Sequence, residues 1–186
     1  MLIRNTYSEQ KGLEIITGWQ PKQQNFKAWH KLPEQKKSVR LNRKAFDDHF
    51  LFDYNFFPGG MLRSTKEWEL YGRSMMEGDM IIQWVKIPPF SPLHFYLIFA
   101  VRVVEVIRSE RTHSFTYHTL HGHPERGRAS FQLEKEHSSC LFTIHSFSAP
   151  SGLLNAPPLS GGVLAYQRYS VRKILTRMSR KYPVVA

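Results

Sequence analysis

The residues best suited to chemistry lie close together, with three histidines and a glutamate among the eight positions 118–125. Imidazole and carboxylate groups are ligands for zinc and other transition metals, so His118, His121 and His123 are candidate metal ligands. A histidine also titrates near pH 7, and His123 with Glu125 is therefore a candidate catalytic acid–base pair. The same composition is typical of a polar turn between two strands. The sequence leaves these three interpretations open.

Two polar residues further along the chain are candidates for a different role. Ser148 follows the last predicted strand, where a serine usually caps or turns the chain and rarely acts as a nucleophile. Gln167 lies on the inner stripe of a predicted C-terminal helix. A buried glutamine needs hydrogen-bond partners, so Gln167 either bonds to groups on the sheet or faces a polar ligand.

Basic residues are the main feature of the composition, since 26 Lys and Arg against 15 Asp and Glu give a net charge of +11. The last acidic residue is Glu136, and the basic residues beyond it fall mostly on the predicted C-terminal helix. Four of them are candidate anion-binding residues: Arg168, Arg172, Lys173 and Arg177. Such a face attracts phosphates or anionic lipid headgroups. It is equally typical of a solvated helix exterior.

Several classes of protein are excluded by what the 186 residues lack. The single cysteine, Cys140, excludes an intramolecular disulfide and a zinc site with two or more thiolates. The glycine pairs fit neither a phosphate-binding P-loop nor a dinucleotide fingerprint, and no nucleophile elbow occurs, so no cofactor is expected. The N-terminus has no apolar stretch of the signal-peptide kind, and the most apolar run, 93–107, is too short to span a bilayer. We therefore expect a soluble cytoplasmic protein without a transmembrane segment.

The hydrophobic pattern predicts the elements that position these residues. A helical spacing covers 42–54 with Asn42 as N-cap, and strands are expected at 79–86, 93–108, 113–120, 128–136 and 140–148. Short polar turns between them predict an antiparallel meander. An amphipathic stripe from Leu164 to Tyr182 predicts a final helix that packs on the sheet. Residues 13–16 are a candidate first strand, and 20–38 have the composition of a loop. The pattern predicts an α+β fold, with an N-terminal extension over 1–40 and one domain over 41–186.

A resemblance to a family supports this layout. The segment Tyr-His-Thr-Leu-His-Gly-His-Pro-Glu-Arg-Gly at 117–127 resembles the hallmark of the domain of unknown function 1990, Tyr-Gly-Thr-Leu-Pro-Gly-His-Pro-Glu-x-Gly-Glu. Phe147, Ser148 and Pro150 match its second segment, and Gln167 with Tyr169 matches its C-terminal helix. The resemblance covers about 100–180. It departs at His118, His121, Arg128 and Ala149, so a metal site that uses His118 or His121 is not a family feature.

Membership implies a helix-grip fold of the Bet v 1 or START kind, in which a curved antiparallel sheet packs around a long C-terminal helix. We then expect a small-molecule ligand, apolar or mixed, between the sheet and the helix, with the loops 121–127 and 149–162 as a lid. The expected ligand-binding residues are Tyr117, Thr119, His123, Glu125, Ser148 and Gln167. The first alternative is binding of nucleic acid or an anionic surface by the basic C-terminal helix. The second is an acid–base enzyme that uses His123 and Glu125.

Overall fold

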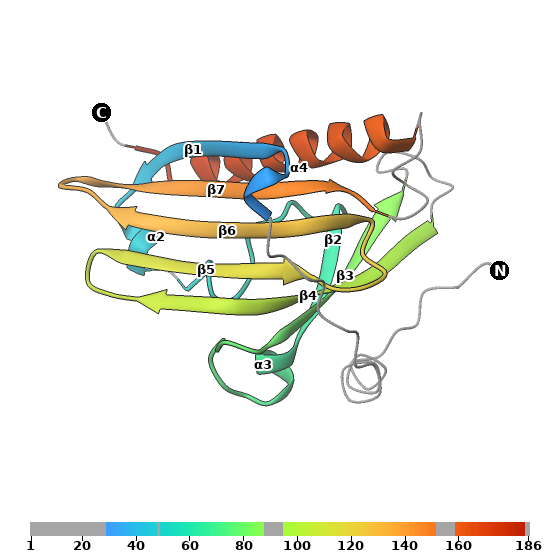
Figure 1. The fold of residues 1–186 in the computed structure, drawn as a ribbon. Helices are drawn as coiled ribbons and strands as arrows, with labels where there is room; N and C mark the ends of the chain where they lie inside the picture. The colour runs from blue at the N-terminus through green and yellow to red at the C-terminus, as the bar shows by residue number, and fades with distance from the viewer. Residues whose placement is uncertain (1–28, 48, 88–94, 152–158, 185–186) are drawn as a thin grey trace.

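The computed structural model describes residues 29–47, 49–87, 95–151 and 159–184. Seven strands form one antiparallel sheet in the order β1-β7-β6-β5-β4-β3-β2 (Figure 1). The strands are β1 (Glu34–Asn42), β2 (Leu62–Lys66), β3 (Met80–Ile87), β4 (Phe95–Arg108), β5 (Thr112–Thr119), β6 (Glu125–Lys135) and β7 (Ser139–Pro150). The helical elements are η1 (Trp29–Lys31), α2 (Lys44–Asp47), α3 (Glu67–Leu70) and α4 (Leu159–Lys181).

The predicted α+β fold is confirmed: a curved antiparallel sheet is followed by a long C-terminal helix. The five predicted strands correspond to β3 through β7, and each pairs with its neighbour in the chain, as a meander requires. A shift in register between Val103 and Glu105 marks a bulge in the long strand β4. Bulges increase local twist, so this irregularity contributes to the curvature of the sheet.

The sheet begins earlier than the sequence pattern indicates. The loop-like interpretation of 20–38 is wrong for residues 34–38, which belong to β1 and pair with β7. The expected domain boundary at residue 41 therefore falls inside a strand. In β1 (EQKKSVRLN) the only apolar residues are Val39 and Leu41, and the strand is held by the register of its partner. The candidate strand at 13–16 lies outside the described residues.

The predicted helix over 42–54 is much shorter than expected. Asn42 caps α2 through its Oδ1, which accepts a hydrogen bond from the Lys44 amide at 3.0 Å, but the helix ends at Asp47. Turns follow, in which Phe50 and Tyr54 are buried, and Tyr54 has a φ of 55°. The three- and four-residue spacing of apolar residues here reflects burial against the sheet and not a continuous helix.

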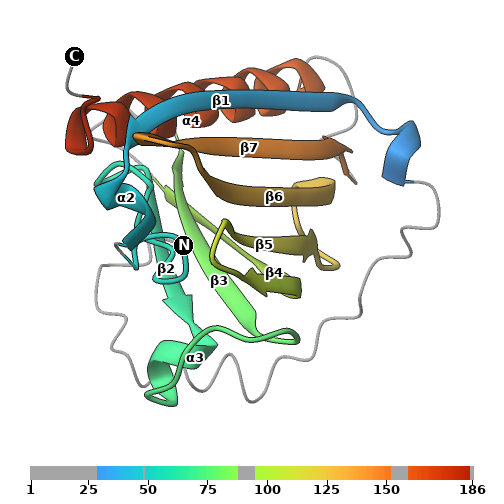
Figure 2. The same ribbon diagram turned by 90° about the vertical axis from the view of Figure 1, so that its left-hand side faces the viewer.

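The C-terminal helix α4 lies along β1 and β7 (Figures 1 and 2). Its buried stripe contains Val171, Ile174 and Met178, as the amphipathic pattern predicts. Just beyond the helix, the Tyr182 carbonyl accepts a hydrogen bond from the Asn42 amide at 3.0 Å, which joins this end of α4 to the end of β1.

Strand alternation places every second residue on the concave face of the sheet, the face toward α4. This face has two regions. One region lies toward the β6–β7 turn (residues 136–138) and is packed with aromatic rings: Phe50, Phe56, Phe115, Phe131 and Phe142. The other region lies toward the β5–β6 turn (residues 120–124). There Thr119, Ser146 and Ser148 are buried on the same concave face. The candidate site lies in this second, polar region.

Candidate functional site

A chain of three polar side chains connects the sheet to the helix at the β5–β6 turn end. Gln167 of α4 donates a hydrogen bond from Nε2 to the Ser148 hydroxyl at 2.7 Å and makes a longer contact of 3.3 Å with the Ser146 hydroxyl. Ser148 also lies close enough to the Glu125 carboxyl to lower its pKa. The structure thus brings together Glu125, Ser148 and Gln167, three of the six predicted ligand-binding residues. Of the two roles open to Gln167, it fills the first, bonding to sheet groups.

The Glu125 carboxyl is the chemically unusual member of this chain. Burial raises its pKa to about 7, and Ser148 only partly opposes that shift. A carboxyl with a pKa near neutrality exchanges its proton readily at physiological pH. Glu125 can therefore donate a hydrogen bond when protonated and accept one, or pair with a cation, when ionised.

Thr119 and Gly127 fix the geometry of the turn between β5 and β6. The Thr119 hydroxyl accepts a hydrogen bond from the Gly127 amide at 3.0 Å and donates one to its carbonyl at 3.3 Å. A side chain at Gly127 would collide with the Phe147 carbonyl oxygen and with Ser148 of the adjacent strand. This close approach of β6 to β7 sets the position of Glu125, two residues earlier. In the structure, Thr119 therefore acts on the site by fixing the backbone of Gly127 through these two hydrogen bonds.

His123 is half-buried and makes two contacts that orient the turn. Its Nδ1 accepts a hydrogen bond from the Glu125 amide at 2.9 Å, and its ring packs edge-on against Phe99 with centroids 4.3 Å apart. Burial lowers the pKa of His123 to about 3, so the imidazole is neutral at physiological pH. With Nδ1 occupied by a backbone donor, His123 is better suited to position Glu125 than to carry a proton.

Tyr117 belongs to a second polar cluster on the concave face, with Tyr54 and Gln83. Gln83 donates to the Tyr54 hydroxyl at 2.6 Å, and the Tyr54 and Tyr117 hydroxyls interact with each other. Burial raises the pKa of both phenols, and the charge of Glu125 raises that of Tyr117 further, so both stay protonated. Neither Tyr54 nor Gln83 was predicted as a site residue from the sequence. The sequence does contain one indication of this cluster, because Gln83 stands within the apolar run of β3. A buried glutamine needs a hydrogen-bond partner.

The candidate metal ligands are not gathered by the fold. His118 lies on the opposite face of β5 from Tyr117 and Thr119, and His121 is exposed in the turn. Within the described ranges no group of three or more His, Cys, Asp or Glu side chains could hold a metal ion. The close spacing of these histidines in the sequence therefore does not translate into a shared site.

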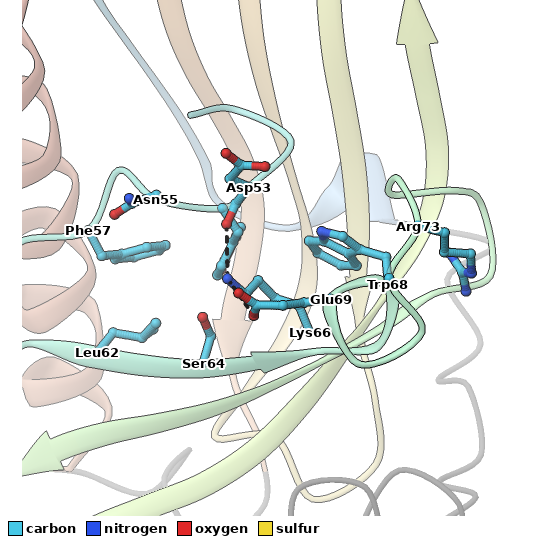
Figure 3. Close-up of a pocket in the computed structure, with 11 residues that line it drawn as sticks. Asp53, Asn55, Phe57, Leu62, Ser64, Lys66, Trp68, Glu69 and Arg73 are labelled. Atoms are coloured by element: carbon cyan, nitrogen blue, oxygen red, sulfur yellow. Dashed lines mark hydrogen bonds and ion pairs between the residues drawn. The ribbon is translucent and has the colours of Figure 1, made fainter. Parts of the chain in front are cut away.

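A pocket of about 510 Å³ lies at the β2 edge of the concave face, between residues 53–57 and β2 with α3 (Figure 3). The Lys66 amine extends across it, donating to the Asp53 carbonyl at 3.2 Å and pairing with Glu69 at 2.8 Å. The other walls carry Phe57, Leu62 and Trp68. Because Tyr54 also lines this pocket, the Tyr54–Gln83–Tyr117 cluster connects it to the polar region around Glu125. This pocket could not be predicted from the sequence, because its walls come from separate segments.

The four candidate anion-binding residues of α4 do not share one environment. Arg168, Arg172 and Lys173 are exposed. Arg177 is half-buried and donates a hydrogen bond from Nη1 to the Phe57 carbonyl. The guanidinium of Arg177 thus joins α4 to the segment before β2, which leaves three of the four residues on the solvent-exposed surface.

The model of the family described as domain of unknown function (DUF1990) matches residues 43–177. This chain belongs to the DUF1990 family. The expected family is thereby confirmed, and the match extends well before residue 100, where the resemblance of individual motifs began. No curated protein matches the chain.

Solved structures support the helix-grip fold of this DUF1990 domain. Human STARD10 is similar with a TM-score of 0.51 at 11% identity, over 98% of this chain and 82% of that one. A hypothetical protein of Helicobacter pylori is similar with a TM-score of 0.53 at 8% identity, over 86% and 97%. A protein of Nitrosospira multiformis is similar with a TM-score of 0.53 at 9% identity, over 81% of this chain and 96% of that one. At these identities the likeness shows the fold alone. Among the described residues, no helix is long and apolar enough to cross a membrane.

Proposed function

We propose that this domain binds a small organic molecule with an apolar body and one polar group on the concave face of the sheet beneath α4. The observation that carries the proposal is the polar cluster of Glu125, Ser148 and Gln167 on a face that is otherwise a protein core. In this cluster Gln167 hydrogen-bonds to Ser148, and Ser148 acts on the pKa of Glu125. Burying a carboxyl is costly unless a partner satisfies it. A hydroxyl, amide or amine of a ligand would provide such a partner for Glu125.

The surroundings of this cluster favour a ligand of mixed polarity. Toward the β6–β7 turn the concave face is aromatic, and toward the β2 edge the Tyr54–Gln83–Tyr117 cluster continues the polar surface as far as the edge pocket. A pocket of that size lies within the usual range for small-molecule sites, about 300–1,000 Å³. Tyr117 and Thr119 would lie beside the ligand. His123 would fix the turn so that the Glu125 side chain faces the ligand.

An acid–base enzyme is the second candidate, and one observation favours it. The pKa of Glu125, about 7, suits a group that accepts and returns a proton at neutral pH. In that function Glu125 would be the proton carrier and His123 its positioning residue. Binding of nucleic acid by the exposed face of α4 has less support, since Arg177 is bound to the Phe57 carbonyl.

Native mass spectrometry of freshly purified protein tests the proposal directly. We expect a non-covalent small-molecule adduct that is present in the wild type and reduced in Glu125→Gln. Glu134→Gln, at an exposed glutamate on the same strand, is the matched control and should keep the adduct. Nile red, a neutral apolar dye, provides a second readout, because its fluorescence should rise on binding to the ligand-free protein. No adduct and no dye response from the folded wild type would refute small-molecule binding.

A further inference from the structure

A second pocket, of about 420 Å³, lies at the opposite end of the sheet from Glu125, near the β6–β7 turn. It is lined by Arg43, Arg111, Lys135, Glu136 and His137. These residues come from three separate places: the link between β1 and α2, the turn between β4 and β5, and the end of β6 with its turn. The fold therefore gathers basic residues that lie up to 94 positions apart, as for Arg43 and His137, which are hydrogen-bonded.

The one acidic residue of this pocket is already neutralised. Glu136 accepts hydrogen bonds from Arg40 at 2.8 and 3.2 Å and another from the Ser139 hydroxyl at 2.6 Å. The Arg40 pair and the Ser139 bond lower the pKa of Glu136. Arg40 thus cancels the charge of Glu136 without being among the lining residues.

Two of the three cations of the pocket, Arg43 and Lys135, are in contrast positioned by groups that carry no negative charge. Arg43 donates from Nη1 to the His137 carbonyl at 3.2 Å. The Lys135 ammonium lies 4.9 Å from the centroid of the Phe46 ring. Within the described part of the chain, no ion pair joins Arg43, Arg111 or Lys135 to a carboxylate, including Asp47 and Glu110 of the adjoining segments. Three unneutralised positive charges thus line one hollow.

We propose that this pocket binds a small phosphate-bearing anion. Guanidinium groups recognise phosphate oxygens through two parallel hydrogen bonds, and the ammonium adds a compact charge. Two arginines and a lysine match a group with two or more negative charges better than a single carboxylate. The same chemistry would accept either a free phosphorylated compound or a phosphorylated lipid headgroup. This site is independent of the proposed ligand site, from which it is separated by the length of the sheet.

Isothermal titration calorimetry with pyrophosphate tests the site, at about 50 mM salt, where screening is modest. We expect saturable binding with one site per chain. Arg111→Gln and Lys135→Met should each weaken it by about tenfold, the change expected when one charge-assisted hydrogen bond is lost. Arg63→Gln, at an exposed arginine of β2, is the matched control and should bind as the wild type does. Circular dichroism of each variant checks that it is folded.

Two results would overturn the proposal. One is the absence of pyrophosphate binding by the folded wild type, and the other is equal binding by the wild type, Arg111→Gln and Lys135→Met. Co-sedimentation with vesicles that contain phosphatidylinositol 4-phosphate identifies the source of the anion. Loss of co-sedimentation in Arg111→Gln would assign a lipid headgroup, and no co-sedimentation of the wild type beside pyrophosphate binding would assign a free compound. Glu125→Gln should leave all of these measurements unchanged, which separates this site from the proposed ligand site.

Discussion

The amide of Glu125 donates its hydrogen bond to Nδ1 of His123 across 2.9 Å, so a neutral imidazole holds the start of β6. His123→Asn retains an acceptor near this position, whereas His123→Ala leaves the amide without one. We expect His123→Ala to lower the free energy of unfolding by about 1–3 kcal/mol and His123→Asn to lower it less. Urea denaturation at pH 7 measures both. Equal losses in the two variants would contradict the positioning role.

The pH dependence of stability should report the titration of Glu125. Its pKa is about 7 when folded and 4.5 in the reference state, so between these values the folded protein holds a proton that the unfolded chain has released. Stability from Glu125 therefore falls as the pH rises from 4.5 to 7. Relative to the wild type, Glu125→Gln should gain stability over this interval, whereas Glu134→Gln should not. A constant difference between Glu125→Gln and the wild type across the interval would be inconsistent with a raised pKa.

His123 has the opposite effect at lower pH. Its pKa falls from 6.5 to about 3 on folding, so between these values the unfolded chain binds a proton that the folded protein does not, and stability is lost on acidification. The contributions of His123 and Glu125 therefore oppose each other between about pH 4.5 and 6.5. The pH profile of Glu125→Gln should accordingly retain the acid sensitivity due to His123.

Gly127 should tolerate no side chain, because a Cβ there would overlap the Phe147 carbonyl and approach the Ser148 Cα within 2.7 Å. We expect Gly127→Ala to cost at least about 2 kcal/mol of stability. Gly161→Ala is the contrasting substitution, since Gly161 lies in α4 with open space around it. It should stabilise the protein by up to about 1 kcal/mol through helix propensity. Thermal denaturation of both variants checks the prediction, which fails if Gly127→Ala melts with the wild type.

The buried Gln83–Tyr54 hydrogen bond should be visible in a double-mutant cycle. Gln83→Leu leaves the Tyr54 hydroxyl without this donor, at a cost of about 1–3 kcal/mol, because both groups are buried. Adding Tyr54→Phe should recover part of the loss, since the unpaired hydroxyl is then gone. Strictly additive effects in urea denaturation would indicate that the two side chains are not coupled.

Arg177 and Arg172 lie on the same helix but should differ in their effect on stability. Arg177→Met removes the hydrogen bond to the Phe57 carbonyl and should cost about 1.5–3 kcal/mol. Arg172→Met, at an exposed position, should stay within about 0.5 kcal/mol of the wild type. Chemical denaturation of the pair distinguishes the two positions. Similar values for both would mean that the Phe57 contact contributes little.

The sequence predicted those elements whose residues alternate or repeat with a clear period. Strands β3 to β7 and helix α4 are of this kind, and Gln167 was predicted from its place on the inner stripe of that helix. Glu125 and Ser148 were singled out instead by their match to the family motif. What the sequence could not predict depends on partners distant in the chain. The strand β1 is defined by pairing with β7, and Tyr54 is placed by an irregular turn with a φ of 55°. The pocket around Arg43 and Arg111 forms only when three separate turns meet.

The position of β1 at the margin of the sheet has one further consequence. An edge strand exposes unpaired backbone N–H and C=O groups that can pair with a strand of a neighbouring molecule. Charged side chains on the edge strand, lysine above all, discourage such pairing. In β1 the sequence Glu-Gln-Lys-Lys carries Lys36 and Lys37 along this margin, and β2 at the other margin carries Arg63 and Lys66. The polar composition of β1 is the reason that the hydrophobic pattern did not predict this strand. The same composition is well suited to protect the exposed edge of the sheet from aggregation.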